Sequence, residues 1–240
     1  MPSRLVNAFV GAGLQFTLTL EGSGPRFRAA LAIASLFVAL PLLAFDSPLS
    51  DQAVRQAYFL GQRRDDSYAR TMAKYTKTLP PPETGPQISA VTLLTPFALL
   101  VQSSNQHLNY SAQQAEIDHR KQKETVQIVV VIRFTNSYPA TLIRPTGTRS
   151  DSPNGFYQRP SGFWKDFDIQ TFVANKQVLA TSTSGQPDVV CDEFGGCNFI
   201  GATVTLEFLA DAFSCSSATV LITPPEGDPT SIDFDLTSLR

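Results

Sequence analysis

Two changes in hydrophobic pattern divide the sequence into three kinds of segment. Residues 29–45 read AALAIASLFVALPLLAF, a run of 17 residues whose only polar side chain is Ser35. Residues 51–76 place apolar side chains three and four positions apart, which predicts helix. Beyond residue 86, apolar and polar side chains alternate, which predicts strands with one buried face. We therefore expect an apolar leader, a helical segment and a β-rich domain.

The apolar run has the residue order of an export signal, because Arg26 and Arg28 precede it. Its length lies between the roughly 7 to 15 residues of a signal-peptide core and the ~20 residues of a membrane-spanning helix. Cleavage and retention as an anchor therefore both stay open. A cut after Ala44 would leave Leu42, rather than a small residue, three positions before the cut. We predict that residues 1–45 direct the chain to the periplasm, as a free protein or anchored in the inner membrane.

The segment of residues 46–77 carries two helix-start signals. Ser50 or the aspartate after it can cap a first helix, and Asp65 or the aspartate after it can cap a second. We expect one broken helix or two short ones, forming a helical arm. The next segment, TLPPPETGP at residues 78–86, has four prolines in nine residues and is predicted to be an extended linker.

Residues 87–240 show the alternation of a β-rich domain. The clearest strand is Thr125–Thr135, which is apolar at every even position from Val126 to Phe134 and is predicted to be central in its sheet. A capping box, Ser111 with Gln114, predicts one helix among the strands. Seven or eight short strands separated by turn residues predict an antiparallel β-sandwich, immunoglobulin-like or C2-like in architecture. The other expected strands are 87–94, 97–102, 167–173, 177–181, 203–208, 218–223 and 232–236.

Composition and charge limit the classes of function. Hydrophobic residues make up 42% of the chain and charged residues 17%, a balance that can bury a core. Removing residues 1–44 takes three basic residues from the 19 in the chain and one acidic residue from the 21, which leaves a formal charge of −4. A mildly acidic domain without a basic stripe is not expected to bind nucleic acid. We expect membrane contact only through the N-terminal segment, if it is not cleaved.

The three cysteines suit an exported protein. Cys191 and Cys197 flank Asp-Glu-Phe-Gly-Gly, a turn sequence, so we predict a disulfide between them. A bridge from Cys215 to either of them is the alternative. A zinc site would use an unusual C-x5-C spacing and would need His107 and His119 as further ligands, so no metal is expected.

The candidate binding residues lie in the stretch NGFYQRPSGFWKDF, residues 154–167. It carries five aromatic side chains within twelve residues, including the only tryptophan. Such density is typical of a contact surface for a protein, a lipid headgroup or a sugar. We predict that Tyr157, Phe163 and Trp164 form this surface, with Trp164 at least partly exposed. The alternative is a loop whose aromatic side chains fold back to close one end of the core.

Catalytic patterns are weak in this sequence. G-x-S-x-G, H-E-x-x-H and P-loop motifs do not occur, so no cofactor is expected. His107 and His119, with Ser111 and Asp118 between them, could serve a hydrolase, but such histidines are more often solvated loop and helix residues. Loop acids gathered at one end of a sandwich could bind calcium, although they lack a D-x-D-x-D-G pattern. These acids are Asp151, Asp166, Asp168, Asp188, Asp192 and Glu193.

Four stretches, PLSDQAVRQAYFLGQRRDD, TGPQISAVTLLTPFALLV, RPSGFWKDFDI and IDFDLTSLR, together resemble a family of exported bacterial proteins without an assigned function. The resemblance covers most of residues 48–240. It implies export and a boundary at the Pro-rich segment, and it carries no catalytic residue.

Two classes of function follow. The favoured one is a non-catalytic envelope protein that binds a partner or ligand through loops at one end of the sandwich. The alternative is a hydrolase or metal-dependent enzyme whose site is assembled from residues distant in sequence. A deep pocket with paired acids or converging histidines would favour the enzyme, and an aromatic surface patch would favour binding.

Overall fold

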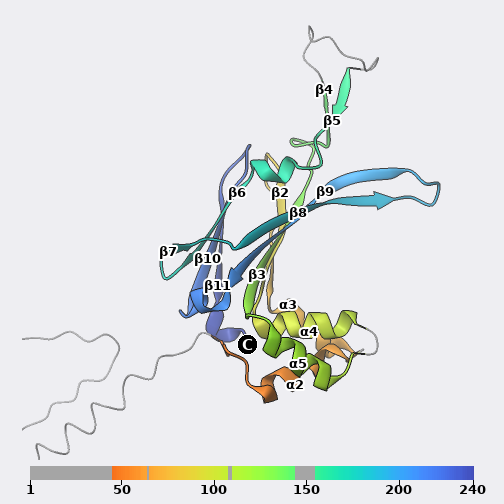
Figure 1. Ribbon diagram of the computed structural model, residues 1–240. Coiled ribbons are helices and arrows are strands. Elements are labelled where there is room, and N and C mark those ends of the chain that lie inside the picture. Colours follow the sequence, from red (N-terminus) through yellow and green to blue (C-terminus); the bar gives the residue numbers. More distant parts are fainter. Residues whose placement is uncertain (1–44, 64, 108–109, 144–154) are drawn as a thin grey trace, which may run out of the picture. The chain divides into compact units, whose positions relative to one another are not determined.

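The computed structural model describes residues 45–63, 65–107, 110–143 and 155–240, all within one compact unit, Leu42–Arg240. Three antiparallel sheets dominate it, which confirms the prediction of a β-rich domain (Figure 1). The first sheet has the order β1 (Thr76–Thr78), β2 (Gln87–Leu94), β3 (Thr125–Arg133), β9 (Cys197–Leu209) and β8 (Ser182–Cys191). The second has the order β11 (Thr230–Asp235), β10 (Ser217–Thr223), β6 (Asp168–Val173) and β7 (Lys176–Val178). The third pairs β4 (Thr141–Ile143) with β5 (Phe156–Gln158).

β3 lies at the centre of the first sheet, as its sequence predicts. Its side chains alternate between buried and half-buried positions along all nine residues. The even-numbered residues from Val126 to Ile132 form the fully buried face, and the odd-numbered residues form the opposite, half-buried face. A strand with partners on both sides has no free edge, so an almost continuous apolar sequence is tolerated there.

The first two sheets share one buried cluster. It contains Val130 and Leu206 from the first sheet and Val220 and Phe234 from the second. Because apolar faces of both sheets meet in this cluster, removing either sheet would expose the inner face of the other.

The four described helices form a helical lobe at one end of the first sheet (Figure 1). Ser50 caps α2 by accepting a hydrogen bond from the Ala53 N–H at 3.2 Å, and Ser111 caps α5 in the same way, as predicted. A second buried cluster, which includes Val54, Ala57 and Val101, holds the lobe together. The helices are α2 (Asp51–Gly61), α3 (Asp66–Ala73), α4 (Pro96–Gln106) and α5 (Ala112–Lys121).

The expected strand at 97–102 is wrong, because this segment is helix α4. The Thr95 hydroxyl accepts a hydrogen bond from the Ala98 N–H at 3.3 Å, and Pro96 stands in the first turn, where its missing N–H costs nothing. The apolar run LLTPFALLV alone does not distinguish a buried strand from a buried helix. The N-cap decides in favour of helix here.

The Pro-rich segment at 78–86 belongs to the compact unit and does not link two separate bodies. Strand β1 pairs with β2 just before it, and the Leu79 N–H bonds to the Ser89 carbonyl at 3.0 Å. Gly85, at a φ of +84°, has its N–H bound to the Ser137 hydroxyl at 2.9 Å. A backbone hydrogen bond therefore attaches the start of this segment to β2, and a bond to a side chain attaches its end to the loop after β3.

Of the predicted leader, residues 1–45, all but Phe45 lie outside the described residues. Within the described ranges, no helix combines the length and apolar character needed to cross a membrane. Phe45, the residue after the predicted cleavage position, is buried in the main core. The last residue of the apolar run is therefore part of the core.

Strand direction separates two ends of the first sheet. β3 begins at Thr125, directly after the helical lobe, and ends at Arg133. Nine residues of strand span about 30 Å. We call the Arg133 end the far end, and the candidate binding residues lie there.

Candidate functional site

Phe163 closes the core at the far end and is not a surface residue. It is only 2% exposed, and its ring centroid lies 4.8 Å from that of Phe134 and 5.6 Å from that of Phe199. The short 3-10 helix η2 (Phe163–Asp166) starts with a hydrogen bond from the Phe163 N–H to the Pro160 carbonyl, at 3.0 Å. This turn directs the ring inward, so the prediction that Phe163 faces a partner is wrong.

Trp164 is half-buried beside this aromatic cluster. Its indole packs against the core and covers Gly185 of β8, where an added Cβ would overlap the ring. The ammonium group of Lys165 lies 5.6 Å from the indole centroid, within the range of a cation–π contact. Trp164 therefore connects η2 to the edge strand β8.

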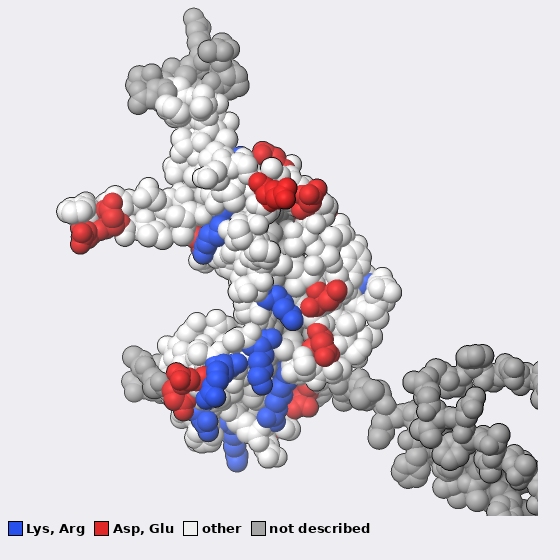
Figure 2. Space-filling model, turned by 180° about the vertical axis from the view of Figure 1, so that it is seen from behind, with Lys and Arg blue, Asp and Glu red and all other residues white. Residues whose placement is uncertain are grey.

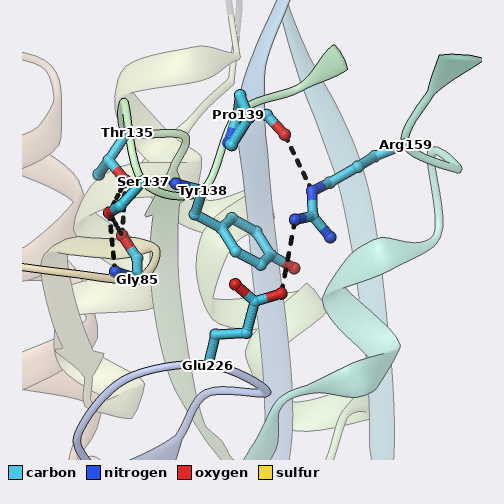
Figure 3. A network of polar contacts seen from close by, with 7 residues as sticks. All are labelled: Gly85, Thr135, Ser137, Tyr138, Pro139, Arg159 and Glu226. Atoms are coloured by element: carbon cyan, nitrogen blue, oxygen red, sulfur yellow. Dashed lines mark hydrogen bonds and ion pairs between the residues drawn. The ribbon is translucent and has the colours of Figure 1, made fainter. Parts of the chain in front are cut away.

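Arg159 ties the base of the β4–β5 arm to the far end (Figure 3). Its guanidinium carbon lies 3.6 Å from the ring centroid of Tyr138, and its Nε donates to the Pro139 carbonyl at 2.9 Å. Its Nη2 lies 3.7 Å from a carboxylate oxygen of Glu226, in the loop between β10 and β11. Burial raises the pKa of the Tyr138 hydroxyl, so this ring stays neutral beneath the arginine. These contacts join three segments that are distant in sequence.

The β4–β5 arm separates the predicted aromatic stretch into two groups. Phe156 and Tyr157 lie on β5 and are exposed, as is Ile143 on the paired strand β4. Phe163 and Phe167 lie in the core instead. Tyr157 is thus at the surface, about where the sequence predicts it, whereas the second half of the stretch closes the core.

β8 and β9 continue beyond the end of β3 as a two-stranded hairpin (Figure 1). The last partner of β9 on β3 is Arg133, opposite Gly201. From Phe199 outward, β9 pairs only with β8 among the described strands. We call residues 189–199 the distal hairpin. The predicted disulfide between Cys191 and Cys197 is confirmed and joins its two strands across a register pair, while Cys215 is free and half-buried.

The turn of the distal hairpin displays the most exposed large apolar side chain among the described residues. Phe194 is 90% exposed, and more than half of the surface of Val189 and Val190 is also open to solvent. One carboxylate oxygen of Asp192 accepts hydrogen bonds from the Phe194 N–H at 3.0 Å and the Gly196 N–H at 2.8 Å. The turn is therefore fixed by side-chain hydrogen bonds and the disulfide. The signal in the sequence is an aromatic residue, Phe194, in the turn between two cysteines.

The two histidines line one groove in the helical lobe, the arrangement that the enzyme alternative requires. The groove has a volume of about 510 Å³, and its apolar side includes Leu99 and Leu100. Nδ1 of His107 lies 2.7 Å from the Ser103 carbonyl, a cap at the end of its own helix. The groove is also lined by Tyr110, Asp118 and Glu124.

The polar groups of this groove are engaged in structural contacts. Glu124 lies 3.1 Å from Nε2 of His119 and accepts hydrogen bonds from the Leu49 N–H at 2.6 Å and the Ser47 hydroxyl at 2.7 Å. The Ser111 hydroxyl is used as the cap of α5, so no serine–histidine pair forms with it. Burial, followed by the nearby Asp118 carboxylate, raises the pKa of Tyr110. Ser103 also lines the groove, and its hydroxyl lies 3.4 Å from Nδ1 of His107, which is closer to the Ser103 carbonyl, at 2.7 Å. The groove therefore brings acids, imidazoles and one serine hydroxyl together.

In the described part of the chain, no three His, Cys, Asp or Glu residues are grouped so that they could hold a metal ion. Asp188, one of the candidate calcium ligands, pairs with Arg133 and accepts a hydrogen bond from the Thr203 hydroxyl at 2.9 Å. Asp151 lies outside the described residues.

Comparison with known proteins adds no family. No protein-family model matches the sequence, and no curated protein matches it with significance. The resemblance to exported bacterial proteins therefore remains a prediction.

Proposed function

We propose that this chain is an exported, non-catalytic envelope protein that binds a protein partner through its distal hairpin. The observation that carries the proposal is the exposed apolar turn, in which Phe194 projects from a hairpin closed by the Cys191–Cys197 disulfide. The exposed valines of β8 extend this apolar surface along the strand.

The hairpin is well prepared for binding. A large aromatic side chain can supply much of the binding free energy of an interface when it enters a pocket. Because Asp192 and the disulfide already fix the turn, little conformational entropy is lost when a partner orders it. The same ring exposed to water contributes nothing to folding.

Charge selects the kind of partner. Asp192 and Glu193 directly precede Phe194, so the apolar ring lies beside two carboxylates. Carboxylates are repelled by anionic lipid and attracted by basic side chains. We therefore propose that the partner is a protein whose surface has an apolar pocket with Lys or Arg at its rim.

Export and architecture belong to the same proposal. A disulfide at an exposed hairpin suits an oxidising compartment such as the periplasm, and the apolar run at 29–45 supplies a targeting signal. Two antiparallel sheets with a shared core support a β-sandwich, immunoglobulin-like or C2-like in general architecture. Whether the signal is cleaved decides between a free and an anchored protein.

Site-specific photo-crosslinking in cells that produce the protein tests the proposal. A photoreactive amino acid at position 194 should give one discrete protein adduct, and the same group at Lys165 should not. The adduct should disappear when Asp192→Lys and Glu193→Lys remove the acidic charges. Equal adducts from both positions, no adduct at 194, or an adduct of only twice the chain's mass would overturn it.

A further inference from the structure

Strand β8 leaves one side of the first sheet open. It is the last strand in the order of that sheet, and among the described residues it pairs only with β9. Eight of its ten residues are exposed, so neither face of the strand is covered along most of its length. Proteins usually protect a long edge strand, because its unpaired N–H and C=O groups can pair with another chain. A part of this edge that lacks such protection is therefore a candidate contact surface.

Three observations indicate which backbone groups of β8 point to the open side. Pro187 has no N–H, so it occupies a position that does not donate to β9. The Cα of Cys191 lies 4.0 Å from that of its disulfide partner, which is typical of opposite residues that exchange no backbone hydrogen bonds. The Asp192 N–H bonds across the hairpin at 2.7 Å, so the even-numbered positions bond to β9. Alternation therefore directs the backbone groups of Val189 and Cys191 outward, together with the Pro187 carbonyl.

The opposite side of the distal hairpin is less open. There the Phe134 N–H, just after β3, bonds to the Ile200 carbonyl of β9 at 3.1 Å. The Phe199 ring packs edge to face against the Phe134 ring, with 4.9 Å between their centroids. The segment after β3 therefore occupies the base of that side, and β8 provides the longer open edge.

This edge carries acidic charge. Residues 182–199 contain no Lys or Arg, and their three acids are Asp188, Asp192 and Glu193. Arg133 of β3 pairs with Asp188, which leaves the two acids of the turn without a basic residue in the same hairpin. Figure 2 shows acidic side chains near the end of the projecting hairpin. A partner segment with Lys or Arg is therefore favoured.

Charge also argues against a second copy of this chain as the occupant. An antiparallel match of Val189–Cys191 in two chains would place Asp188 of each chain opposite Asp192 of the other. Like charges directly opposite each other destabilise a pair of strands. A basic segment of a different protein would instead gain from the same acids.

We propose that the partner protein adds an extended basic segment to the open edge of β8, as a strand beside Val189–Cys191. This inference rests on the proposed function and names the way in which the partner binds. The outward backbone groups of β8 bond to the added strand and supply affinity, as in other cases of strand addition. The acids of the turn contact its Lys or Arg side chains, and Phe194 enters the apolar pocket beside it. These side-chain contacts supply specificity.

Crosslinking at position 194 in the full chain provides the measurement. Val189→Pro removes an outward N–H without removing a bond to β9, as Pro187 already does two residues earlier. Loss of one hydrogen bond weakens an interaction about five-fold, so the yield of the protein adduct should fall at least about five-fold when the partner is not saturating. Val189→Thr keeps the N–H and a strand-forming side chain, so it should lower the yield clearly less.

A second proline variant controls for damage to the sheet. Thr183 is also an odd-numbered, exposed residue of β8, but it lies outside the distal hairpin, so Thr183→Pro should leave the adduct yield unchanged. Equal losses for the two proline variants, or for proline and threonine at position 189, would overturn strand addition. An adduct that Val189→Pro leaves unchanged would overturn strand addition alone. No adduct at 194 in the chain without these changes would overturn the proposed function as well.

Amide hydrogen exchange tests the open edge without a partner. The sample is purified residues 42–240, a compact unit that contains both buried clusters. The N–H groups of Val189 and Cys191 should exchange quickly, and those of Val190 and Asp192 slowly, because only the even-numbered positions bond within the hairpin. Equal protection of the Val189 and Val190 N–H groups would overturn the proposal.

Discussion

Replacing Phe163 with alanine should strongly destabilise the domain. The ring is 2% exposed and lies within 4.8 to 6.3 Å, centroid to centroid, of four other aromatic rings. An aromatic side chain buries roughly 150 to 250 Å², which at about 25 cal/mol per Å² gives an upper limit of about 4 to 6 kcal/mol. Measured Phe→Ala costs in cores are about 3 to 5 kcal/mol, and we expect that range for the free energy of unfolding.

The assay is urea denaturation of residues 42–240, followed by far-UV circular dichroism. The urea concentration at the midpoint should fall, while the slope of the unfolding free energy against urea stays constant. The substitution changes the surface area exposed on unfolding only slightly, and this area sets the slope. Since a domain of this kind has roughly 5 to 15 kcal/mol of stability in total, the change should be large.

Phe156→Ala is the matched control, because it removes the same ring from the same aromatic stretch. Phe156 is about half exposed on β5, so we expect a loss within about 0.5 kcal/mol. A cost below about 1 kcal/mol for Phe163→Ala, or equal costs for the two variants, would refute the division of this stretch into a core group and an arm group.

Two further predictions concern other parts of the chain. Gly185→Ala should cost about 1 to 3 kcal/mol and shift the emission of Trp164, because the new Cβ overlaps the indole; Gly162→Ala, whose Cβ would meet only the Lys165 side chain at ordinary distance, should change neither. A fusion of residues 1–50 to a reporter that is active only outside the cytoplasm should be active, because basic residues precede the apolar run at 29–45. A silent reporter would exclude export.

Local signals in the sequence determined much of the fold. The caps at Ser50 and Ser111 depend on side chains and backbone within three residues, so they can be recognised without the tertiary structure. The alternation in β3 reflects the period of a strand, and it located the centre of the first sheet. The Cys191–Cys197 pair closes a turn of five residues, so its geometry is also local.

Tertiary structure decided what local pattern leaves open. Phe163 is buried and Phe156 is exposed because different elements lie beside the two rings. Both are phenylalanines in the same aromatic stretch, so the local sequence does not distinguish them. The strand at 182–191 has little apolar alternation because its side chains are mostly exposed at a sheet edge, and it is a strand through pairing with β9. The groove with both histidines combines residues from separate helices. Packing alone brings these side chains together, so only the folded chain could show them.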